Sequence, residues 1–261
     1  MDLQLVERVA LVCGAGGGLG RAIAAQLAAE GATVVGLDRD AGALATTHSI
    51  ITAEGHRFRP MPVDLIDPAQ VDTAVTTVER TQGPVTVLVN NTGGPPPGPI
   101  QGVPLADWRT HFTSMVAPVV HLTDRVLPGM RAAGWGRVIT SASSGVVAPI
   151  PNLGLSNSLR SALVGWSKTL ASEVAAHGIT VNVVLPGRIA TSRILELDRA
   201  RAEREGRAVD EVAAASVSTI PVGRYGRPAE YGAVVAFLAG VGASFVNGSV
   251  VRVDGGMIAS V

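Results

Sequence analysis

The chain has 261 residues, of which 47% are hydrophobic and 16% charged, a composition that supports a large buried core and argues against disorder. Basic and acidic residues number 21 each, so no excess positive charge favours a nucleic acid or an anionic membrane as partner. A single cysteine, Cys13, excludes an intrachain disulfide and a thiolate-rich metal site, and we expect no metal. The sequence shows neither a leader pattern nor a long apolar span, so we expect a soluble, cytoplasmic protein.

The first predicted unit consists of a strand, a glycine-rich turn, a helix and a second strand. An apolar run at 8–13 ends in glycines, and an alanine-rich helical stretch at 19–30 is followed by a second apolar run at 33–37. Together these segments make a βαβ unit, whose crossover we expect to be right-handed.

The alternation of strand and helix continues to the end of the chain. Five further strands are expected at 58–63, 85–90, 137–141, 179–185 and 250–253. Apolar runs such as 85–89 are typical of parallel strands that helices cover on both faces. The pattern predicts an α/β fold: one doubly wound Rossmann domain over 1–261, with a seven-stranded parallel sheet and helices on both faces.

Two segments interrupt this alternation. Residues 93–99 contain four prolines and predict a stiff loop just after a strand. Residues 192–218 are the most charged part of the chain and predict a mobile, lid-like helical excursion. Because loops carry selectivity in such folds, these two segments are expected to choose the substrate.

The glycines at 14–20 lie where the first strand turns into the first helix. Glycine lets the backbone approach a diphosphate, and a helix N-terminus offers unpaired N–H groups and the positive end of a dipole. Such a turn also serves merely to reverse a chain, but its place between strand and helix favours a dinucleotide site.

Asp38 follows the second strand, where a carboxylate accepts hydrogen bonds from an adenosine ribose and repels a 2′-phosphate. Asp38 could instead be a solvated turn residue, and the neighbouring Arg39 could accept a phosphate. We expect NAD as the cofactor in preference to NADP.

Five motifs, in this order, resemble those of the short-chain dehydrogenase/reductase family over almost the whole chain. Residues 13–20 are similar to its T-G-x-x-x-G-x-G, 64–65 to its adenine-contacting aspartate and apolar residue, 90–93 to N-N-A-G, 186–191 to P-G-x-I-x-T, and 253–256 to V-D-G-G. The ketoacyl-carrier-protein-reductase-like members are the most similar. The resemblance implies NAD(P)-dependent hydride transfer between a nicotinamide and the carbonyl or alcohol group of a small molecule. It also implies cofactor contacts from Gly14, Gly18, Leu19, Gly20, Asp38, Asp64, Leu65, Asn91, Gly93, Arg160, Pro186, Gly187, Ile189 and Thr191.

The catalytic residues are where the resemblance fails. The family's serine falls on Ser143, but its Y-x-x-x-K tyrosine and lysine fall on Ser156 and Arg160, and its asparagine falls on Met115. A serine hydroxyl is a far weaker acid than a phenol. Arginine stays charged and cannot exchange a proton at ordinary pH.

Ser143, Ser156 and Arg160 nevertheless form a candidate catalytic cluster. Ser156 and Arg160 are four residues apart and share one helix face, so the three side chains could polarise a carbonyl while water or the substrate supplies the proton. Alternatively, Ser156 could cap its helix and Arg160 could pair with a carboxylate. His111 could point toward the pocket, although a partly buried helix histidine is the commoner case.

The altered residues leave a second hypothesis open: a cofactor-binding protein without redox chemistry, such as a pseudoenzyme, structural subunit or sensor. A weaker third possibility is that no dinucleotide binds. The resemblance places Tyr225 and Tyr231 away from the nicotinamide. Apolar faces on the helices at 107–130 and 155–177, together with the resemblance, imply a homo-oligomer, either a dimer or a tetramer.

Overall fold

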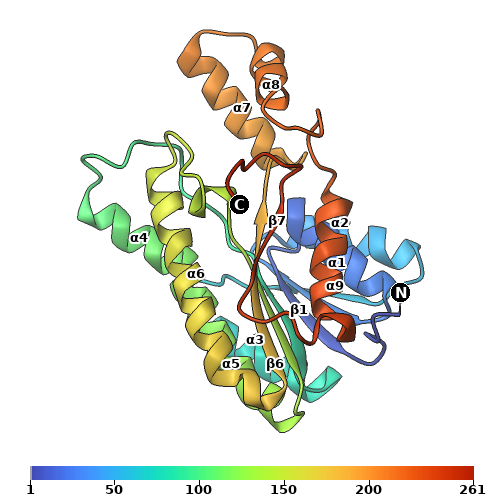
Figure 1. Ribbon diagram of the computed structural model, residues 1–261. Coiled ribbons are helices and arrows are strands. Elements are labelled where there is room, and N and C mark those ends of the chain that lie inside the picture. The colour runs from blue at the N-terminus through green and yellow to red at the C-terminus, as the bar shows by residue number, and fades with distance from the viewer. Residues whose placement is uncertain (1) are drawn as a thin grey trace.

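The fold is built on one parallel sheet (Figure 1). The computed structural model describes residues 2–261, and its strands are β1 (Val9–Cys13), β2 (Thr33–Asp38), β3 (Phe58–Pro62), β4 (Val85–Asn90), β5 (Gly136–Ser141), β6 (Ile179–Pro186) and β7 (Val250–Val253). The seven strands lie in the order β3-β2-β1-β4-β5-β6-β7, and all neighbours are parallel. This confirms the predicted doubly wound sheet. The strand order reverses between β1 and β4, where a crevice opens at the carboxyl ends.

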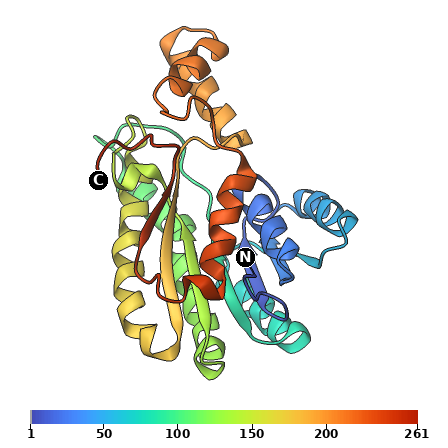
Figure 2. The same ribbon diagram turned by 45° about the vertical axis from the view of Figure 1, so that its right-hand side comes forward.

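Helices cover both faces of the sheet, as Figures 1 and 2 show. One layer contains α1 (Gly18–Ala29), α2 (Ala41–Ala53) and α9 (Pro228–Ala239), and the other contains α3 (Pro68–Gln82), α5 (Ala117–Ala132) and α6 (Gly154–Val174). Ile23 of α1 and Val235 of α9 lie in the first core, and Val126 and Leu170 in the second. The short 3-10 helices are η1 (Ser144–Val146), η2 (Ala175–His177) and η3 (Val241–Ala243).

The helical stretch expected at 107–130 is two helices in the structure. A helix α4 (Leu105–Met115) ends before Val116, and α5 starts at Ala117 with Pro118 in its first turn. Proline lacks the N–H that would continue the helical hydrogen bonds, and its ring clashes with the preceding turn. This proline therefore accounts for the break.

The charged segment after β6 forms α7 (Ser192–Glu205) and α8 (Val209–Val217), which project beyond the carboxyl ends of the strands (Figures 1 and 2). The proline-rich segment 93–99 runs irregularly after β4. Gly98 is tied to the start of α6, because its N–H donates to Asn152 O at 2.7 Å and its carbonyl accepts from Gly154 N at 3.1 Å. Across residues 2–261, the helices all fall short of the length and apolarity that crossing a bilayer requires.

Candidate active site

A cavity of about 880 Å³ opens at the carboxyl ends of the strands. Residues that directly follow β1, β2, β4 and β6 line it, as expected for the switch point of a doubly wound sheet. Of the predicted cofactor and catalytic residues, all but one line this cavity: Gly14, Gly18, Leu19, Asp38, Asp64, Leu65, Asn91, Gly93, Ser143, Ser156, Arg160, Pro186, Gly187, Ile189 and Thr191. The structure thus brings both predicted sets of residues into one space.

Gly20 is the exception, because it does not line the cavity. A Cβ on Gly20 would overlap the carbonyl oxygen of Gly14, so this glycine lets α1 pack closely against the end of β1. Gly14 and Gly18 have φ values of +63° and +53°, a left-handed backbone that favours glycine. The expectation of a direct contact from Gly20 therefore gives way to a packing role beneath the glycine-rich turn.

The Asp38 carboxylate is fixed against the glycine-rich turn. Its Oδ2 accepts the N–H of Gly16 at 3.0 Å, and its Oδ1 accepts the N–H of Asp40 at 3.1 Å. Gly16 must be a glycine here, because a Cβ would stand 2.8 Å from Asp38 Oδ2. Asp38 is half-buried and faces the cavity, so it is more than a solvated turn residue.

Asn91 joins the ends of β1 and β4, since its Nδ2 donates to Cys13 O at 3.3 Å. Cys13 is 1% exposed, and burial raises the pKa of its thiol to about 12. A thiol held protonated is a poor nucleophile. Cys13 is therefore the apolar end of β1.

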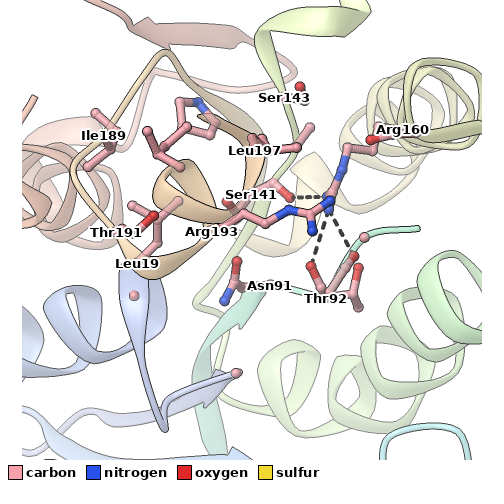
Figure 3. A pocket seen from close by; sticks show the side chains of 18 of the residues that line it. Leu19, Asn91, Thr92, Ser141, Ser143, Arg160, Ile189, Thr191, Arg193 and Leu197 are labelled. Carbon is pink, nitrogen blue, oxygen red and sulfur yellow. Dashed lines mark hydrogen bonds between the residues drawn. The ribbon is translucent and has the colours of Figure 1, made fainter. Parts of the chain in front are cut away.

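Arg160 links the carboxyl ends of β4 and β5 through backbone carbonyl groups. Its Nη2 donates to Thr92 O at 3.2 Å and to Gly93 O at 2.9 Å, and its Nη1 donates to Ser141 O at 3.3 Å (Figure 3). None of the ion pairs among residues 2–261 includes Arg160, so the expected alternative of a carboxylate partner is wrong. Burial lowers the pKa of this guanidinium to about 10, which still leaves it charged at neutral pH.

The two serines of the predicted cluster differ in how they are held. Ser143 caps η1, and its Oγ accepts the N–H of Gly145 at 3.1 Å, which leaves its own hydroxyl hydrogen free to donate. Ser156 is 8% exposed and lies in the first turn of α6. The N-cap residue of α6 is Leu153, so the alternative that Ser156 caps this helix is wrong.

Neither tyrosine lines the cavity. The Tyr225 hydroxyl donates to Asp198 Oδ2 at 2.7 Å. Tyr231 is fully buried beneath the site, with its hydroxyl 2.8 Å from Ser141 Oγ and 3.2 Å from Val184 O. Burial raises the pKa of the Tyr231 phenol further above its ordinary value. Both tyrosines are therefore structural.

The structure adds functional candidates that the sequence did not reveal. Ser141 and Arg193 both line the cavity. Ser141 ends β5, which also contains Arg137 and Thr140, so its polar side chain was no distinctive signal in the sequence. Arg193 lies in the charged excursion, where nothing in the local pattern separates it from other arginines. His111 is half-buried, as the structural interpretation requires, and it also lines the cavity.

The chain is similar in sequence and in fold to known reductases. The family described as enoyl-(acyl carrier protein) reductase matches residues 14–258. A 3-oxoacyl-[acyl-carrier-protein] reductase, FabG of Vibrio harveyi, is 31% identical over 98% of this chain and 99% of its own. Among solved structures, L-sorbose reductase of Gluconobacter frateurii, complexed with NADPH and L-sorbose, superposes with a TM-score of 0.93 at 31% identity over the full length of both chains. YwfH, an NADPH-dependent reductase involved in bacilysin biosynthesis, superposes with a TM-score of 0.92 at 27% identity over 97% of this chain and 99% of its own.

Proposed function

The chain belongs to the short-chain dehydrogenase/reductase family, and from this premise we propose that it is an NAD(P)-dependent oxidoreductase acting on a carbonyl or alcohol group. One observation carries the proposal: a single cavity is lined both by the glycine-rich turn with Asp38 and by the cluster of Ser143, Ser156 and Arg160. A dinucleotide and a small substrate would thus meet in one space. The reductase names of the relatives favour this function over the non-redox alternative.

The chain offers the space and the donors that a dinucleotide requires. A Cβ on Gly17 would meet no atom within 4 Å, so the N-terminus of α1 faces open space. Backbone N–H groups at the positive end of a helix dipole suit a diphosphate. When bound, the nicotinamide ring supplies hydride for reduction or accepts it for oxidation. The adenosine half would be held by Asp38, Asp64 and Leu65, the diphosphate by Gly14, Gly18 and Leu19, and the nicotinamide half by Asn91, Gly93, Arg160, Pro186, Gly187, Ile189 and Thr191.

The candidate catalytic residues act by stabilising charge on the carbonyl oxygen. As the carbonyl becomes an alkoxide, the free hydroxyl hydrogens of Ser143 and Ser156 donate to the oxygen, and the positive charge of Arg160 lowers its energy. Neither a serine nor a charged arginine is a competent acid near neutral pH. The proton therefore comes from water or from a group on the substrate itself.

The choice between NADH and NADPH turns on Asp38. Its carboxylate faces the cavity and is held in place by Gly16 and Asp40, so a 2′-phosphate placed beside it would be repelled. Arg39 also lines the cavity, and its positive charge favours NADPH. Two structurally similar reductases are described with NADPH. We propose that Asp38 dominates and that NADH binds more tightly.

Calorimetric titration with NADH and then NADPH is the first experiment. We expect both to bind, NADH more tightly, and failure of both to bind well-folded protein would overturn the assignment. Steady-state assays with a panel of ketones and alcohols then test turnover. A double variant, Ser156→Tyr with Arg160→Lys, restores the family's pair. Activity in this variant alone would mean that the native protein is not an oxidoreductase.

A further inference from the structure

Two arginines from different helices converge at the substrate end of the cavity. Arg160 extends from α6 and Arg193 from α7, and Figure 3 shows their side chains pointing toward one another. Both bind the same stretch of backbone after β4: Arg160 Nη2 donates to Gly93 O at 2.9 Å, and Arg193 Nη2 donates to Pro95 O at 2.9 Å. The carbonyl groups on either side of Gly94 thus hold the two cationic groups in place.

Gly94 leaves an open space between the two guanidinium groups. A Cβ at this position would stand 3.6 Å from Arg160 Nη2 and 3.7 Å from Arg193 Nη2, and apart from the adjoining residues 93 and 95 it would meet no other atom within 4 Å. The backbone of Gly94 does not have a positive φ, so its conformation does not itself require glycine. A side-chain methyl at Gly94 would therefore lie against both guanidinium groups, and the glycine leaves that space free.

The positive charge at this end of the cavity is poorly balanced. Arg160 has only carbonyl partners among the described residues. Arg193 has one acidic neighbour, Glu196 Oε2 at 3.6 Å from Nη1, and the side chain of Glu196 is 63% exposed. Exposed pairs of this kind contribute little. The carboxylates that line the cavity are Asp38, at the end of β2, and Asp64, just after β3.

We propose that Arg160 and Arg193 bind the carboxylate of the substrate, which makes the substrate an oxo acid or the corresponding hydroxy acid. The proposal rests on the oxidoreductase function above and names its substrate class. Both Nη2 hydrogens of Arg160 are taken by Thr92 O and Gly93 O, so Arg160 would bind the carboxylate through a remaining N–H group. Such charge-assisted hydrogen bonds are stronger than neutral ones. In a 2- or 3-oxo acid the carboxylate lies close to the carbonyl, so Arg160 would touch both groups.

The test measures binding without turnover. Protein saturated with the oxidised cofactor is titrated with 2-, 3- and 4-oxopentanoate and with the methyl ester of each, because a ketone is not reduced by an oxidised cofactor. At least one acid should bind about tenfold more tightly than its ester, the size expected for charge-assisted hydrogen bonds at a partly exposed site. Equal affinity of every acid and its ester would overturn the proposal.

Two variants perturb the proposed carboxylate site in different ways. Arg193→Gln removes one charge, and Gly94→Ala keeps both charges but fills the space between them. Each should remove most of the advantage of the acid over the ester and leave the affinity for the oxidised cofactor within about twofold. Arg199→Gln is the matched control, since Arg199 is exposed on the same helix and does not line the cavity. An equal loss with Arg199→Gln would point to general charge and overturn the proposal.

The possible results distinguish a failure of the carboxylate site from a failure of the oxidoreductase function. If Arg193→Gln weakens binding of the cofactor as much as binding of the acid, Arg193 serves the cofactor and the carboxylate site is wrong. If acids bind selectively but NADH reduces none of them, the oxidoreductase function fails and the carboxylate site stands. If acids and esters are reduced with equal kcat/KM, the function stands and the carboxylate site fails.

Discussion

The two halves of the cavity are built by different means. In the cofactor half, glycines and one carboxylate fix the backbone, as in the hydrogen bond from the Gly16 N–H to Asp38. In the substrate half, long cationic side chains reach backbone carbonyl groups, as Arg160 does at Thr92 and Gly93. The cofactor half depends on the lack of side-chain atoms at the glycine-rich turn. The substrate half depends on the positive charge of its side chains.

This difference determines which measurement a substitution should change. The glycine-rich turn at 14–20 tolerates almost no added atom, so a substitution there should lower the affinity for the cofactor. A set of charged donors acts on the developing oxyanion, so a change there should appear in kcat.

The largest effect is expected for a substitution in the glycine-rich turn. Gly20→Ala would push a methyl group into the carbonyl oxygen of Gly14, so α1 must shift away from β1. We expect NADH to bind at least ~100-fold more weakly, because the diphosphate contacts depend on that helix end. Calorimetry measures the loss, and Gly129→Ala in α5 is the control, since its Cβ would make only ordinary contacts at 3.5 Å. Normal NADH affinity in Gly20→Ala would show that the glycine-rich turn is not rigid.

The next largest effect is expected for a substitution in the substrate half of the cavity. Arg160→Met removes the cation and leaves the carbonyl groups of Thr92, Gly93 and Ser141 without their donor. The loss of a preorganised oxyanion donor should lower kcat by about 100-fold. Single-turnover rates at saturating cofactor give the value, and Arg160→Lys, which keeps the charge, should lose less. Because Arg160 is also expected to contact the nicotinamide half of the cofactor, cofactor affinity is measured as well, and a loss of affinity with kcat intact would mean that Arg160 serves the cofactor alone.

A smaller effect is expected for the choice of cofactor. Asp38→Asn removes the charge that would face a 2′-phosphate while keeping an acceptor for the N–H of Gly16. The ratio of NADPH to NADH dissociation constants should fall by about tenfold, the size of one screened charge pair. Asp64→Asn, the other cavity carboxylate, is the comparison. An unchanged ratio in Asp38→Asn would leave Arg39 as the determinant.

The smallest effect concerns pH. Burial lowers the pKa of Arg160 to about 10, so its charge is complete at neutral pH and is lost only as the pH rises through that value. Serine hydroxyls do not titrate in this range. We therefore expect kcat to vary by less than about twofold between pH ~6.5 and ~8.5, and to fall at higher pH. An ionisation near neutral pH that vanishes in His111→Gln would make His111 the proton donor.

The same division explains how much could be predicted from the sequence. Strands, the glycine-rich turn and the position of Asp38 follow from local patterns of apolar residues and glycine, and the sheet was predicted correctly. The break at Val116 was signalled locally by Pro118 and was still missed. Arg193 could not be found, because its place opposite Arg160 depends on where the start of α7 lies relative to α6 in space, which no local pattern encodes.

The backbone bridge from Gly98 to Asn152 and Gly154 limits how the proline-rich loop can vary in length. Two backbone hydrogen bonds join the proline-rich loop to Asn152 and Gly154, directly ahead of Ser156. A longer or shorter loop would therefore displace the start of α6, with Ser156, along with the rim of the pocket. No such backbone bridge couples α7 and α8 to α6 in the described chain, so a change of length in that segment would not act on the start of α6 in this way.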